Sequence, residues 1–130
     1  MNRSMIFKRN GFSLIEVLIA LTILAIGLLA IASLQVTSVR GNFFSNSLMQ
    51  ATYVAQDRLE FLKNLPFSDP LLSTGNRVDG TTKISDLVFN RSYTVELVND
   101  PKGNYLKISY LVKWNDGVNH NISFSTIRSQ

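Results

Sequence analysis

The sequence predicts an α+β fold in which one long N-terminal helix packs on a small antiparallel sheet of three or four strands. Three observations support this expectation. An apolar run occupies residues 12–34, and apolar residues then recur with helical spacing to about residue 64. The last third of the chain alternates between apolar and polar residues, which is typical of half-buried strands.

Composition excludes several classes of protein. Hydrophobic residues make up 45% of the 130 residues and charged residues only 17%, which is too apolar for a disordered chain. The absence of cysteine excludes disulfides, thiolate metal sites and cysteine nucleophiles. One histidine, His120, is expected at the surface or at the edge of the core. No phosphate-binding, dinucleotide-binding or hydrolase motif is present, so we expect no enzyme, no metal and no cofactor.

The basic charge is concentrated at the N-terminus. The net charge is +4, and Arg3, Lys8 and Arg9 supply three of these charges within residues 1–11, which hold no acid. The rest of the chain carries ten basic and nine acidic residues, and no three basic residues are consecutive. The sequence therefore predicts no nucleic-acid-binding face.

The apolar run predicts a membrane-spanning helix. Only four of the 23 residues in 12–34 are polar. A helix needs about 20 apolar residues to cross a bilayer, and a domain this small could not bury such a run on all sides. The preceding positive charges favour a cytoplasmic location for residues 1–11 and place the later residues outside.

A cleaved secretory signal is the competing interpretation of this run. Ala30-Ile31-Ala32 fits an A-x-A cleavage site before Ser33. The apolar stretch is longer than the usual 7–15 residues, however, and contains an acid, Glu16, near its start. We therefore favour a retained helix from which only a short leader is removed.

The residues alone offer one explanation of Glu16. An ionised carboxylate within a spanning helix costs about 3 kcal/mol on insertion scales, so it is expected to have a partner. Ser13-Leu14-Ile15-Glu16 fits a capping box, in which Glu16 reaches back to the backbone of Ser13 at the helix N-terminus.

The segment from Lys8 to Leu18, with Gly11, Phe12 and Glu16 in fixed order before an apolar helix, resembles the prepilin signature of type IV pilins and type II secretion pseudopilins. The resemblance implies that a prepilin peptidase cuts after Gly11, at the end of a 1–11 leader, and N-methylates Phe12. It also implies that Glu16, the fifth mature residue, acts in subunit assembly. The stretch 23–35 is most similar to minor pilins of the PilV class, and no family motif is found beyond residue 65.

The head is expected over residues 35–130. Its helical part should continue to about residue 64 and end before Pro66. Prolines and glycines then predict a loop over 65–86, with a short strand or helical turn inside it, followed by a sheet over 87–128. Three strands are expected, at 91–98, 105–114 and 118–127. The stripe expected to face the sheet consists of Phe44, Leu48, Ala51, Ala55, Leu59 and Leu62.

Together these observations predict a structural subunit, a minor type IV pilin held in the bacterial inner membrane with its head in the periplasm and then extracted into a pilus or pseudopilus. Expected partners are the prepilin peptidase, other major and minor pilins and the inner-membrane assembly platform, with no nucleic acid bound directly. The first alternative is a pseudopilin of type II secretion or competence. An alternative of another class is a secreted or membrane-anchored periplasmic binding domain whose N-terminal resemblance is accidental.

Overall fold

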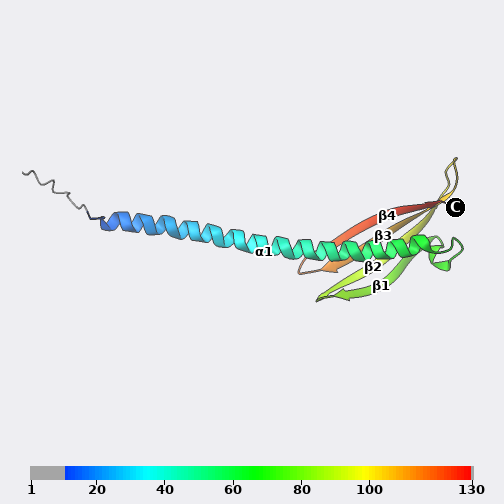
Figure 1. The fold of residues 1–130 in the computed structure, drawn as a ribbon, viewed down its shortest axis with the longest axis horizontal. Helices are drawn as coiled ribbons and strands as arrows, with labels where there is room; N and C mark the ends of the chain where they lie inside the picture. The colour runs from blue at the N-terminus through cyan, green and yellow to red at the C-terminus, as the bar shows by residue number, and fades with distance from the viewer. Residues whose placement is uncertain (1–10, 130) are drawn as a thin grey trace, which may run out of the picture. The chain divides into compact units, whose positions relative to one another are not determined.

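The computed structural model describes residues 11–129 and has the expected α+β architecture (Figure 1). One helix, α1, is followed by a short 3₁₀ helix, η1, and by a four-stranded antiparallel sheet in the order β1-β2-β3-β4. The bounds are α1 Leu14–Asn64, η1 Pro70–Leu72, β1 Gly75–Ile84, β2 Leu87–Val98, β3 Tyr105–Asn115 and β4 Asn119–Ser129. The chain divides into two units between Asn42 and Phe43.

In the first unit, the helical residues 14–42 are all exposed. The large apolar side chains of this half of α1 are between 44% and 81% exposed, and they lie on every side of the helix. A surface helix of a globular protein would bury one stripe and expose polar residues elsewhere. This half of α1 has no polar face and buries nothing within the described residues.

In the second unit, the later half of α1 buries one face against the sheet. Ala51, Ala55, Leu59 and Leu62 are buried as expected, and Leu48 packs on the same core. Phe44 is 40% exposed and does not belong to this core. The buried face also contains two residues outside the expected stripe, Ser47 and Val54.

The inner face of the sheet supplies the other half of this core. The five apolar residues that alternate along β3 are at most 4% exposed: Leu106, Ile108, Tyr110, Val112 and Trp114. The register aligns Tyr93 of β2 with Tyr110 and then with Phe124 of β4, which packs partly on the core. Because side chains alternate along a strand, this register places the intervening residues on the outer face of the sheet.

The loop expected over residues 65–86 holds both a helical turn and a strand, and more of it is structured than expected. It contains η1 and the ten-residue strand β1, so the sheet begins at Gly75 rather than at residue 87. Strand β1 lacks the usual pattern because its register shifts between Val78 and Gly80, where a bulge interrupts the alternation. Val78 is apolar but 88% exposed, so this residue does not mark a buried position of the strand.

Candidate functional site

The peptide bond between Gly11 and Phe12 lies ahead of the helix. Residues 11–13 have no helical structure, and α1 begins at Leu14. Both flanking residues are exposed, Phe12 to 83%, and among residues 11–129 no atom beyond the chain neighbours lies within 4 Å of a Cβ placed on Gly11. The backbone at this junction is therefore open to a protein that binds it in extended form.

Ser13 caps the first turn of α1. The backbone N–H of Glu16 donates a hydrogen bond to the Ser13 hydroxyl at 3.2 Å, and Val17 donates its N–H to the Ser13 carbonyl at 3.2 Å. These bonds form one half of the expected capping box. Within residues 11–129 no hydrogen bond or ion pair involves the Glu16 carboxylate, which stands exposed on the first turn. Its position near the helix N-terminus is electrostatically favourable.

The other polar side chains of the apolar run satisfy their own hydrogen bonds. The hydroxyls of Thr22 and Ser33 donate to the carbonyls four residues earlier, at 2.8 and 3.0 Å, and Thr37 does the same just beyond the run at 3.1 Å. Hydrocarbon cannot supply hydrogen bonds, so a helix within it needs this internal pairing. Helix α1 is long and apolar enough to cross a membrane, and none of its most apolar window is buried.

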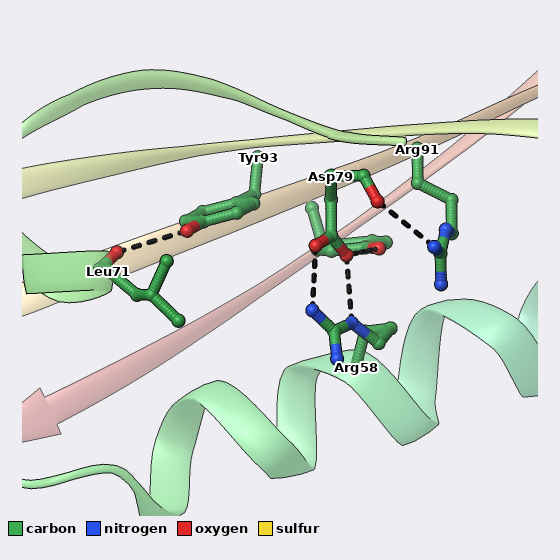
Figure 2. Close-up of polar contacts among 6 residues, drawn as sticks. Arg58, Leu71, Asp79, Arg91 and Tyr93 are labelled. Atoms are coloured by element: carbon green, nitrogen blue, oxygen red, sulfur yellow. Dashed lines mark hydrogen bonds and ion pairs between the residues drawn. The ribbon is translucent and has the colours of Figure 1, made fainter. Parts of the chain in front are cut away.

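A second polar cluster lies in the head, between α1 and β1 (Figure 2). The Asp79 carboxylate accepts two hydrogen bonds from the Arg58 guanidinium, at 2.6 and 2.8 Å, and one from the Tyr110 hydroxyl at 2.5 Å. Arg91 donates to the backbone carbonyl of Asp79 at 3.0 Å. Asp79 is the extra residue of the β1 bulge, so the bulge directs this carboxylate toward the helix.

The charges of this cluster fix its protonation states. Burial alone would raise the pKa of Asp79, but hydrogen bonds from Arg58 and Tyr110 and the charges of Arg58 and Arg91 together lower it. The hydrogen bond to Asp79 raises the pKa of Arg58 against the opposing effect of burial. Burial raises the pKa of Tyr110, and the bond to Asp79 raises it further. At neutral pH the carboxylate is therefore ionised and both donors keep their protons.

Sequence reasoning did not identify this cluster. Arg58 lies 21 residues from Asp79, and Tyr110 lies 31 residues from it, so no local spacing connects them. The bulge that turns Asp79 inward has no signature beyond the neighbouring Gly80, whose φ is +83°. Through the ion pair between Arg58 and Asp79, this cluster joins β1 to α1.

His120 lies at the edge of the core, as expected. Its Nε2 is 2.9 Å from a carboxylate oxygen of Asp116, and its ring lies between those of Phe44 and Trp114, with centroids 5.0 and 5.3 Å away. Its side chain is 24% exposed. Within residues 11–129, no three His, Cys, Asp or Glu side chains gather closely enough to hold a metal ion.

Comparison with known families bears on the N-terminal segment alone. Residues 6–32 match the family model described as the prokaryotic N-terminal methylation motif. The chain carries a prepilin-type methylation motif. The match covers Gly11, Phe12 and Glu16, and it supports a precursor of the type IV pilin or pseudopilin kind, anchored in a membrane. No curated protein and no solved structure matches the chain significantly.

Proposed function

We propose that the protein is a minor type IV pilin of the PilV class, a structural subunit that takes part in pilus assembly or modification. The observation that carries this proposal is the methylation motif over residues 6–32, followed by a helix that is exposed and apolar on all sides. A motif of this kind implies processing by a prepilin peptidase and assembly with other pilins. The apolar half of α1 is the part that would exchange lipid for the helices of neighbouring subunits.

Processing takes place between Gly11 and Phe12. Hydrolysis of this peptide bond removes the 1–11 leader on the cytoplasmic side and frees the α-amine of Phe12, which the same peptidase then methylates. The open backbone around Gly11 and the start of the helix at Leu14 support this assignment, because a protease needs an extended segment. The first ten residues of the leader lie outside the described residues.

Glu16 acts in assembly. Residue 12 would carry a positive amine after cleavage, and the exposed Glu16 carboxylate has no partner within residues 11–129. In a low-dielectric filament core, the amine of an incoming subunit would pair with the Glu16 carboxylate of a neighbour already assembled. Much of that attraction offsets desolvation, so its main effect would be to set the register between subunits.

The processed chain resides in the inner membrane with its head, residues 35–130, in the periplasm, and it then enters a pilus with the help of the assembly platform and other pilins. A pseudopilin of type II secretion or DNA uptake would use the same N-terminal chemistry. The alternative of another class, a secreted or anchored periplasmic binding domain, is favoured by Ala30-Ile31-Ala32 before Ser33.

Intact-mass measurement of the membrane-extracted protein tests the processing step. We expect a chain that begins at Phe12 and carries one additional methyl group. The Gly11→Val variant should accumulate as uncleaved precursor, whereas the matched variant Gly27→Val, at a glycine within the helix, should still be cleaved. A wild-type chain that begins at Ser33 would favour the secreted domain and contradict the proposal.

The assembly role is tested separately with Glu16→Gln, which removes the charge and keeps the side-chain shape. We expect loss of incorporation into sheared filaments while membrane levels and leader cleavage stay normal. Thr22→Val, which removes the next polar group along the run, is the control and should assemble. Normal incorporation of the Glu16→Gln chain would refute an assembly role for this residue.

A further inference from the structure

The outer face of the sheet, turned away from α1, has two neighbouring grooves. The larger has a volume of about 570 Å³ and crosses β2, β3 and β4 beside the turns that join β1 to β2 and β3 to β4. The smaller has a volume of about 350 Å³ and crosses β1, β2 and β3. Both volumes fall within the range of small-ligand sites. Because Asn90 of the first groove and Ser92 of the second are adjacent outer-face positions on β2, the two grooves follow one another along the strand.

The first groove contains amide groups arranged by the strand register. Lys113 of β3 pairs with Asn90 on one side and with Asn121 on the other, so the three side chains form a row across neighbouring strands. Adjacent strands are about 4.8 Å apart, and the row therefore spans about 10 Å. Within residues 11–129 neither Asn90 nor Asn121 makes a side-chain hydrogen bond, so both carboxamides are available to a ligand. Val88 adds an apolar surface beside them.

The second groove repeats this combination with hydroxyl groups. Ser92, Thr94 and Ser109 line it together with the apolar side chains of Val78 and Leu111. Thr94 donates to the side-chain oxygen of Asn76 at 2.6 Å, and Ser109 bonds to Ser125 at 3.0 Å, so these groups are held in fixed positions. Each groove thus presents short groups that donate and accept hydrogen bonds next to a small aliphatic surface.

We propose that these grooves bind a linear glycan. A sugar ring presents hydroxyl groups at its edge and aliphatic C–H groups on its faces, which matches amide and hydroxyl side chains beside Val88, Val78 and Leu111. A carboxamide supplies both a donor and an acceptor, as a pair of neighbouring sugar hydroxyls requires. Along β3 the grooves extend from Asn115 to Ser109, or about 20 Å, which is long enough for a short oligosaccharide.

Other classes of ligand fit less well. Protein interfaces are enriched in aromatic residues, methionine and arginine. Three aromatic residues, Tyr93, Trp114 and His120, line the grooves from inner-face positions, whereas the groove side chains on the outer face are mainly serine, threonine, asparagine and small aliphatic residues. A nucleic acid would need a cluster of positive charge. The basic residues that line the two grooves are Lys113 and Arg77, of which Arg77 occupies an inner-face position, and Asp86 lies in the same groove as Lys113 as a counter-charge. The inference concerns the head alone and does not depend on its membership of a filament.

The test uses the full chain in a zwitterionic detergent, because detergents with sugar headgroups would compete. Maltohexaose, cellohexaose and N-acetylchitohexaose are titrated against isotope-labelled protein, and backbone and asparagine side-chain NMR shifts are recorded. We expect at least one of them to shift resonances of Asn90, Ser92 and Asn121, while buried Ile108 stays unchanged. The double variant Asn90→Ala, Asn121→Ala should weaken that binding about tenfold. Glu96→Gln, on the same face outside both grooves, should bind normally.

Three results would overturn the inference. The first is the absence of shifts with all three hexasaccharides. The second is a set of shifts that lies elsewhere on the protein. The third is equal binding by the wild type and the double variant, provided that both give the same fluorescence from buried Trp114. A chain that fails in filament assembly but still binds the sugar through these residues would refute the proposed pilin role and leave the glycan site intact.

Discussion

Replacement of Asp79 by asparagine tests how strongly the polar cluster stabilises the head. The Asp79 side chain is 11% exposed and accepts three side-chain hydrogen bonds, two from Arg58 and one from Tyr110. Asp79→Asn keeps one acceptor oxygen but removes the charge and one arm of the bidentate pair. Hydrogen bonds to charged groups contribute about 1.5–3 kcal/mol each, whereas exposed ion pairs contribute at most about 1 kcal/mol.

The magnitude follows from the exposure of each partner. Arg58 is 27% exposed, so water can replace part of what it loses, and the ion pair must be discounted accordingly. Tyr110 is fully buried, so water cannot replace the hydrogen bond that its hydroxyl loses when the acceptor at position 79 is weaker. We expect the free energy of unfolding to fall by about 2 kcal/mol at pH 7. Asp57→Asn is the control, because Asp57 is exposed on the same helix and should change stability by less than about 0.5 kcal/mol.

The assay is urea unfolding of the full chain in detergent, followed by the fluorescence of Trp114, which is the single tryptophan and is 2% exposed. The pKa of Asp79 is lowered in the fold, so its contribution is present above the unfolded value of about 3.9 and is lost as the pH falls through the lower folded value. The difference between wild type and Asp79→Asn should therefore narrow below about pH 4. Equal stabilities at pH 7, or a difference that does not change with pH, would refute this reasoning.

Three further substitutions test other parts of the structure. Tyr110→Phe removes one donor and should lower the free energy of unfolding by about 1 kcal/mol, measured by the same urea titration. Ile108→Ala should lower it by about 2–5 kcal/mol because the residue is fully buried, whereas Ile127→Ala, at a position 64% exposed, should have almost no effect in a paired thermal scan. Ser13→Ala removes the cap of α1, and hydrogen exchange of the Glu16 amide should accelerate by about fivefold; an unchanged rate would show that the cap contributes nothing.

The parts of the fold that the sequence predicted are those with a regular local pattern. Strand β3 alternates without interruption, and the five apolar residues on one face are all buried. The helix end was predictable because Pro66 excludes Leu65 from the helical region, and α1 ends at Asn64. In these segments the backbone period and the burial pattern agree, so neighbouring residues carry the necessary information.

The length of strand β1 and its place in the sheet were not predicted, because its stability comes from contacts distant in sequence. Its bulge breaks the alternation, and Gly75 and Gly80 resemble turn residues when they are considered locally. What holds the strand is its pairing with β2 and the bond between Asp79 and Arg58. The outer-face grooves were missed for a related reason, since the row through Lys113 exists only once three strands are in register.

The N-terminal segment could be interpreted from the sequence because its characteristic residues lie close together along the chain. The apolar run holds four polar residues, and the side chains of Ser13, Thr22 and Ser33 each make a hydrogen bond within one turn of the helix. These three are compatible with hydrocarbon whatever surrounds them.

Glu16 differs, because its carboxylate has no bond within residues 11–129 and would be costly to bury unpaired. At the membrane surface water can hydrate this carboxylate, but that water is lost when the helix moves into a bundle of apolar helices. A helix of this composition therefore enters such a bundle most favourably where a positive group meets Glu16, and the amine that cleavage would free on a neighbouring chain is a positive group of the required kind.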